Sequence, residues 1–203
     1  MNPQDRTASP PVDDRGIRSP VGAGRAVAPV IAVWVVFVVA GGLEPIGRHF
    51  LVLGLLRVSL FVALLGFAAA FVARSGLLGR LGLGAAAIGA GLNLLGGIGS
   101  VITDGWSYDP FGPGSALEPP WYAYVIGLSA FVFALGSILT GVAGRSGGWL
   151  AVAAVLGGVL YPMAFVMQGL YGHDPGDLLG HLIWIAPWLA LTIGLARSGR
   201  SSA

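Results

Sequence analysis

The chain has 203 residues, 55% of them hydrophobic and 10% charged, with a formal net charge of +2 and a mean hydropathy of +0.81. Soluble domains carry roughly a quarter charged residues, so this composition excludes an ordinary water-soluble protein and indicates one that lies in a lipid bilayer. The absence of cysteine excludes disulfides, thiol catalysis and cysteine metal sites.

Residues 1–25 are rich in Pro, Asp, Arg, Ser and Gly and have little apolar periodicity, which is typical of a disordered tail. Six apolar stretches follow, each close to the ~20 residues that a bilayer-spanning helix needs. They run over residues 26–43, 50–73, 81–102, 121–143, 149–170 and 178–196. The sequence therefore predicts an all-α, polytopic bundle of six transmembrane helices over 26–196, with Pro162 as a kink and 197–203 as a short polar tail.

The first apolar stretch has a second interpretation, a signal peptide that is removed from the mature protein. Its charged leader is long for a signal peptide, and no clear cleavage site precedes a soluble domain. We therefore expect it to be retained as a helix. If it is cleaved, the other five helices keep the same orientation.

The positions of the arginines predict which ends of the helices face the cytoplasm. All eleven basic residues are arginines, and nine of them flank the same ends of the predicted helices: Arg6, Arg15, Arg18, Arg25, Arg74, Arg80, Arg145, Arg197 and Arg200. Only Arg48 flanks the opposite ends. Positive residues concentrate on the cytoplasmic side of membrane proteins, so both termini are predicted to be cytoplasmic, and the outer side is left acidic. Because the arginines are scattered singly, this distribution also argues against nucleic-acid binding.

The tripeptide Arg-Ser-Gly recurs at residues 74–76, 145–147 and 197–199, each time at the predicted cytoplasmic end of an even-numbered helix. One interpretation is a threefold duplication of a helical hairpin, since transporters often contain internal repeats. The simpler interpretation is local chemistry. Arginine suits a helix C-terminus, and glycine ends a helix in the left-handed conformation.

Arg57 is the most informative residue, because it lies about 10 Å inside the second predicted helix. A charge at that depth is costly and often marks a functional site. We expect it to point into the bundle and pair with an outer carboxylate, with Glu44 as the leading candidate. In the alternative interpretation, its long side chain reaches out to the headgroups.

Asn93 lies in the middle of the third predicted helix, on a stripe with Ala85, Gly89 and Gly97 at a spacing of four residues. Small residues on one stripe allow a neighbouring helix to approach closely, and the amide is able to hydrogen-bond across the contact. The alternative is that Asn93 lines a path for a solute.

The longest connection, residues 103–120, is rich in aromatic residues and proline. Aromatic residues gather at membrane interfaces, and we expect them to form such a belt. The alternative is a lid over an outward-facing cavity, because loops of this length are often functional.

All three histidines, His49, His173 and His181, fall on the predicted outer side. His173, Asp177 and His181 are spaced by four residues, as in some metal sites. However, Asp174 followed by Pro175 is typical of a helix start, which places His173 outside the helix. We therefore expect neither a metal site nor haem held by His49 and His181, and no cofactor. Phosphate-loop, zincin and nucleophile-elbow motifs are absent, which argues against an enzyme.

These features favour a multi-pass protein of the cell membrane that transports or senses a small solute. Its predicted outward-facing polar pocket comprises Glu44, Arg57, Asn93, Asp177 and His181. Two alternatives are an accessory subunit that packs on a membrane-protein partner or a second copy through Gly/Ala-rich helices, and a metal- or haem-dependent redox protein. The lipid bilayer is the expected environment in each case.

Overall fold

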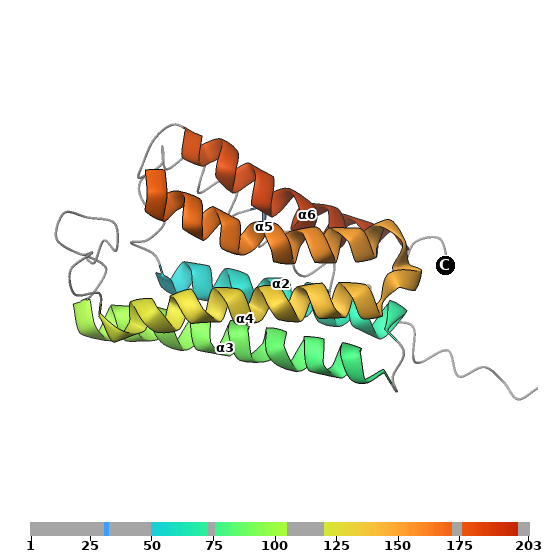
Figure 1. Ribbon diagram of the computed structural model, residues 1–203, viewed down its shortest axis with the longest axis horizontal. Helices are drawn as coiled ribbons and strands as arrows, with labels where there is room; N and C mark the ends of the chain where they lie inside the picture. Colours follow the sequence, from blue (N-terminus) through green and yellow to red (C-terminus); the bar gives the residue numbers. More distant parts are fainter. Residues whose placement is uncertain (1–30, 33–49, 73–75, 105–119, 172–175, 199–203) are drawn as a thin grey trace, which may run out of the picture.

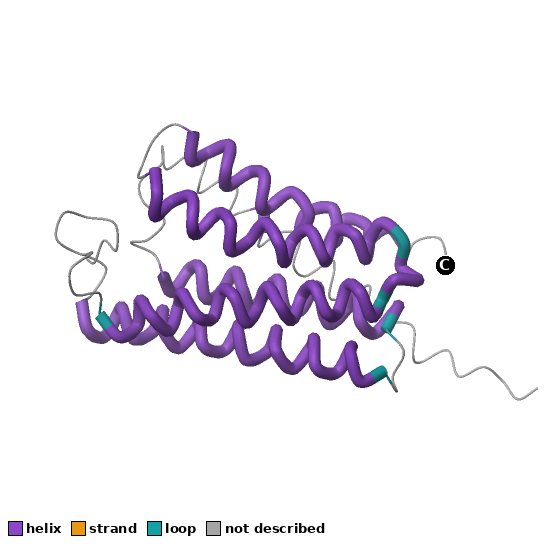
Figure 2. The backbone as a smooth tube through the Cα atoms, in the orientation of Figure 1, coloured by secondary structure: helices purple, strands orange, loops and turns teal. Residues whose placement is uncertain are grey.

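The computed structural model describes residues 31–32, 50–72, 76–104, 120–171 and 176–198. Apart from Ile31 and Ala32, these ranges contain five α-helices and one short 3-10 helix, and none of the described residues forms a strand (Figure 2). The all-helical fold class is therefore confirmed. The first apolar stretch is described only at Ile31 and Ala32, which are helical.

The helices follow the predicted apolar stretches closely. Helix α2 spans Phe50–Phe71, α3 spans Leu77–Asp104, and α4 spans Trp121–Ala143. A 3-10 helix, η3, covers Arg145–Gly147 before α5 spans Trp149–Tyr171 and α6 spans Gly176–Ser198. Helix α3 is longer than predicted at both ends, because it begins at Leu77, ahead of Arg80, and continues two residues past Ile102 to Asp104.

Within the described residues, α2, α3 and α4 are long and apolar enough to cross a membrane. Helices α5 and α6 contribute shorter apolar segments, Trp149–Met163 and Ile183–Ser198. The outward-facing side chains are apolar along their length, for example Leu95 on α3, Leu128 on α4 and Val152 on α5. Large contiguous apolar surfaces are rare on soluble proteins, and these faces suit contact with lipid tails.

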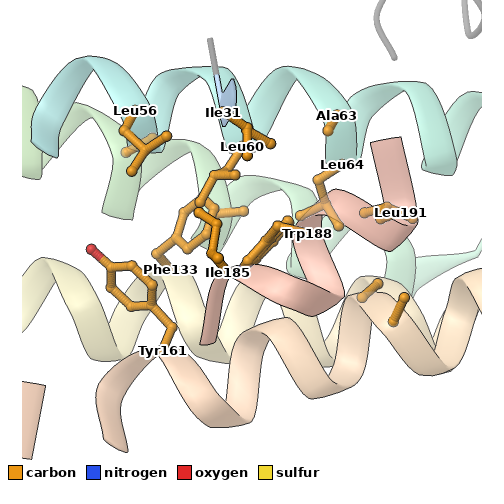
Figure 3. Close-up of a cluster of buried hydrophobic side chains, with 14 of the residues drawn as sticks. Ile31, Leu56, Leu60, Ala63, Leu64, Phe133, Tyr161, Ile185, Trp188 and Leu191 are labelled. Atoms are coloured by element: carbon orange, nitrogen blue, oxygen red, sulfur yellow. The ribbon is translucent and has the colours of Figure 1, made fainter. Parts of the chain in front are cut away.

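The five helices lie side by side in two groups (Figure 1). Helices α2, α3 and α4 form one group, in which α3 packs against both α2 and α4. Helix α5 packs against α4, and α6 packs against α5 and contacts α2. Phe133 of α4, Tyr161 of α5 and Trp188 of α6 meet α2 in the core between the two groups (Figure 3).

The interface between α3 and α4 is built from small residues on both helices. A Cβ added at Gly89 would lie 2.5 Å from the Phe133 backbone nitrogen, and one at Gly82 would lie 2.6 Å from Thr140 Oγ1. On the facing helix, a Cβ at Gly136 would collide with the backbone of Ala86. The predicted close approach at Gly89 and Asn93 is therefore found in the structure.

The contact face of α3 nevertheless differs from the predicted stripe. It runs along Gly82, Ala86, Gly89, Asn93 and Gly96, with spacings that alternate between four and three residues. A spacing of four residues turns by 400° and drifts around the helix, whereas alternating fours and threes keep one face toward a straight neighbour. This is why Ala85, predicted on the stripe, is only half-buried.

The three exposed arginines among the described residues, Arg80, Arg145 and Arg197, lie near one end of the bundle. They are found at the start of α3, in the turn after α4 and at the end of α6. Figure 1 shows that these three segments lie near the same end of the molecule. The shared end agrees with the arrangement that the arginine pattern predicts.

The Arg-Ser-Gly tripeptide at 145–147 does not end helix α4 in the expected way. Helix α4 ends at Ala143, and the tripeptide forms the separate helix η3. The left-handed glycine is the next residue, Gly148, with φ of 57°. Gly147 instead lies against an aromatic ring of α2, because a Cβ there would be 2.9 Å from Phe67. The equivalent tripeptides at 74–76 and 197–199 lie partly outside the described residues.

Candidate functional site

Arg57 lies in the third turn of α2 with its side chain pointing into the bundle, where its exposure is 0%. It is one of the largest fully buried side chains of the described chain. The alternative interpretation of the sequence required the side chain to reach the headgroups. Because the side chain is fully buried among the helices, it does not do so. A buried guanidinium is stable only where hydrogen bonds and charge compensate for its lost hydration.

The hydroxyl of Ser129 on α4 links Arg57 to Asn93. Arg57 Nη1 donates to Ser129 Oγ at 2.6 Å, and Asn93 Nδ2 donates to the same oxygen at 3.1 Å. The hydroxyl in turn donates to the carbonyl oxygen of Ile126 at 2.6 Å, one turn earlier on α4. Ser129 thus accepts two hydrogen bonds and donates one, which is its full capacity. We call Arg57, Asn93 and Ser129 the polar centre.

Two aromatic rings border the polar centre on the side of α4 and α5. The guanidinium carbon of Arg57 lies 4.3 Å from the centre of the Tyr161 ring and 5.8 Å from that of Phe133. Both distances fall within the range of cation–π attraction. Tyr161 packs edge-on against Trp184 at 5.0 Å, and Phe133 lies 5.7 Å from Trp188, so α6 supports both rings.

One edge of the guanidinium remains without hydrogen bonds. Arg57 Nε and Nη2 are both buried and have no hydrogen-bond partner among the described residues, and the same holds for Asn93 Oδ1. Buried polar groups are nearly always paired in proteins, so three such atoms in one small region indicate that an additional group belongs there.

The structure describes the side chains of two of the five residues in the predicted pocket. Arg57 and Asn93, predicted from separate arguments, meet at Ser129. Glu44 lies outside the described residues, so its predicted ion pair with Arg57 remains a prediction. Asp177 and His181 lie in the first two turns of α6, but their side chains are not among those described.

The histidine-based predictions also depend on residues outside the description. His49 and His173 fall in undescribed segments, and the side chain of His181 is not described. Within the described residues, no group of three His, Cys, Asp or Glu side chains is placed to hold a metal ion.

Sequence reasoning missed Ser129, Tyr161 and Phe133. Serine and aromatic residues are common in apolar helices, so nothing in their local sequence marks them. Their roles depend on the register between helices, which places Ser129 opposite Asn93 and Tyr161 beside Arg57. A search for small polar residues near the depth of Arg57 would have retrieved Ser129, eight residues after the start of α4.

Comparison of the chain with protein-family models, curated proteins and solved structures gave no match. The polar centre is the feature of the molecule that bears on its function, because function depends on the residues of a site and not on the fold alone.

Proposed function

We propose that this chain is a multi-pass protein of the cell membrane that crosses the bilayer six times with both termini in the cytoplasm. The proposal is supported by three helices of membrane-spanning length, by apolar outer faces, and by exposed arginines near one end of the bundle. Helices α5 and α6, at 23 residues each, and the apolar stretch over 26–43 supply the remaining spans.

Labelling of single cysteines tests this topology directly, because the natural chain has no cysteine. We expect Ser198→Cys, at the end of α6, to react with a membrane-impermeant maleimide only after cells are permeabilised. Ser115→Cys, in the connection between α3 and α4, should react in intact cells. Labelling of both positions from outside would contradict the cytoplasmic C-terminus.

We further propose that the protein binds a small polar solute inside the bundle at the polar centre, for transport or sensing. One observation supports this most strongly: the fully buried Arg57 has two nitrogen atoms without partners among the described residues, and the side-chain oxygen of Asn93, which shares the Ser129 hydroxyl with Arg57, has none there either. A purely structural arginine is a costly solution, because apolar side chains of similar volume usually stabilise a protein as well or better. Charged residues inside membrane bundles commonly mark solute or ion paths.

Thermal unfolding of the purified protein in detergent tests this proposal against a panel of anionic, neutral and cationic small solutes. A ligand that binds only the folded state stabilises it by RT ln(1 + L/Kd), where L is the free ligand concentration, so the melting temperature rises with the logarithm of that concentration once it exceeds Kd. We expect at least one solute to raise the melting temperature of the natural protein and not that of Arg57→Met. If the natural protein responds to no solute and Arg57→Met is less stable than the natural protein, the arginine has a structural role only and the proposal is contradicted.

The accessory-subunit hypothesis required small-residue faces that are free to meet a partner. In the structure, Gly82, Gly89 and Gly96 of α3 contact α4. On α5, Gly157 faces Trp188 and Gly158 faces α4. Gly84 and Gly91 have open space beside them, but isolated glycines on an apolar face do not specify a partner. The solute-binding proposal therefore has the stronger support.

A further inference from the structure

We propose that the solute bound at the polar centre is a small carboxylate that also carries a hydroxyl group, of the 2-hydroxycarboxylate class. The inference rests on the proposed function and names the chemistry of its ligand. Some polar atoms of the polar centre have hydrogen-bond partners and others have none among the described residues, and the donors and acceptors without partners define what a ligand must supply.

The two unpartnered nitrogens of Arg57 form one edge of the guanidinium. Nη1, which lies on the same side as the side-chain stem, is already used by Ser129. Nε and Nη2, which remain, carry N–H bonds that point in parallel in the same direction. This pair matches the two oxygens of a carboxylate and binds them through two parallel hydrogen bonds. A neutral carbonyl oxygen accepts from the same edge but brings no negative charge to the buried guanidinium, so it binds more weakly than a carboxylate.

The unpartnered oxygen of Asn93 adds a second requirement. Its amide nitrogen is committed to Ser129, and the Ser129 proton is committed to Ile126. Asn93 Oδ1 therefore needs a hydrogen-bond donor from elsewhere. An ionised carboxylate has no proton to donate, so a carboxylate alone leaves this oxygen unpaired. A hydroxyl group on the same molecule supplies the missing donor.

This second requirement favours a solute over a carboxylate of the chain itself. Glu44 or Asp177 would satisfy the free edge of Arg57 but not Asn93 Oδ1.

The positive charge of Arg57 favours the same class of ligand. Among the residues whose side chains the structure describes there is no aspartate or glutamate, so the buried positive charge has no anionic partner there. An ammonium group as the donor would add a second positive charge beside the guanidinium, which disfavours amino acids.

Three probes separate these requirements. Lactate carries both groups, propionate lacks only the hydroxyl, and lactamide replaces the carboxylate with a neutral amide. We expect lactate to raise the melting temperature of the detergent-purified protein, with an apparent affinity about tenfold above that of propionate, since an unmade hydrogen bond to a buried acceptor costs about that factor. Lactamide should produce no shift at the same concentrations.

Variants assign the response to the named atoms. Arg57→Lys lacks the paired N–H edge, so it should lose the lactate response, whereas Arg80→Lys, near the arginine-rich end, should keep it. Asn93→Leu should bind lactate and propionate equally. If Asn93→Leu does not fold, the comparison of the three probes on the natural protein still decides the proposal.

Other outcomes overturn the inference in distinguishable ways. If lactamide acts as well as lactate through Arg57, the site takes neutral solutes, so the inference fails while the proposed function stands. If the natural protein ignores lactate but Glu44→Gln or Asp177→Asn responds to it, the chain's own carboxylate occupies Arg57. If no probe and no solute of the wider panel binds, both proposals fail.

Discussion

The guanidinium of Arg57 on α2 lies 4.3 Å from the centre of the Tyr161 ring on α5, although α3 and α4 separate these two helices in the sequence. The aromatic face compensates part of the buried charge that hydrogen bonds leave uncompensated. A cation over an aromatic face gains about 2 kcal/mol where water is excluded. Tyr161 thus links the charge on α2 to the second group of helices.

Replacing Tyr161 with leucine should lower the free energy of unfolding by about 2 kcal/mol, because leucine fills similar space but has no π face. Tyr161→Phe keeps the ring and should be destabilised less. Reversible unfolding in mixed detergent measures both changes. Equal losses for the two variants would mean that the hydroxyl, and not the ring, supplies the stabilisation.

Ser129→Ala should destabilise the bundle by about 1–3 kcal/mol, because it removes the acceptor shared by two buried donors, Arg57 Nη1 and Asn93 Nδ2. Ser59→Ala is a matched control. Among the described residues, the hydroxyl of Ser59 donates to the carbonyl oxygen of Leu55 in its own helix at 3.0 Å, so its loss should change stability by less than about 0.5 kcal/mol. The two variants are compared by their unfolding midpoints. A Ser129→Ala protein as stable as Ser59→Ala would show that the polar centre tolerates the lost acceptor.

Much of this fold follows from the sequence because bilayer-spanning helices are set by length and hydropathy. The predicted stretch 121–143 matches α4 at both ends, and 149–170 matches α5 to within one residue. The position of Arg57 is also evident from the sequence alone, because a charged residue within an apolar stretch of this length is unusual. Arg57 was therefore found from the sequence.

The residues that contact Arg57 could not be predicted from the sequence. The partners of Arg57 depend on the rotation and register of four other helices, which are fixed by packing and not by composition. The alternation of three- and four-residue spacings on α3 turns Asn93 toward Ser129. The local sequence around Ser129 resembles that around any serine in an apolar helix, and only the facing helix distinguishes it.

Gly89→Ala should loosen the interface between α3 and α4. The added Cβ would lie 2.5 Å from the Phe133 nitrogen and 2.7 Å from its Cα, and backbone atoms are unable to rotate aside. Overpacking of this kind costs about 1–3 kcal/mol. Because Phe133 borders the polar centre, the solute response should weaken as well.

Gly91→Ala provides the control for that experiment, since it lies on the same helix and is exposed, and a Cβ there meets nothing within 4 Å. Its melting temperature should stay the same or rise, because alanine favours a helix over glycine. If Gly89→Ala and Gly91→Ala have the same melting temperature, the two helices do not pack as closely as described.

Ile31 tests whether the first apolar stretch packs into the bundle. Its side chain is 0% exposed and belongs to the core that contains Leu60 and Trp188 (Figure 3). Ile31→Ala should therefore lower the free energy of unfolding by about 2 kcal/mol or more, since in a bilayer the loss comes from the cavity and from missing dispersion contacts.

The neighbouring residue separates packing from a general effect on this stretch. Ala32 is exposed, so Ala32→Leu adds an apolar side chain on the side that faces lipid in the proposed topology, and it should leave the melting temperature unchanged. A stable Ile31→Ala protein would mean that the stretch contributes nothing to the core, and that its role is confined to membrane insertion. If only Ala32→Leu lowers the melting temperature strongly, the face that carries Ala32, and not the face that carries Ile31, packs against α2.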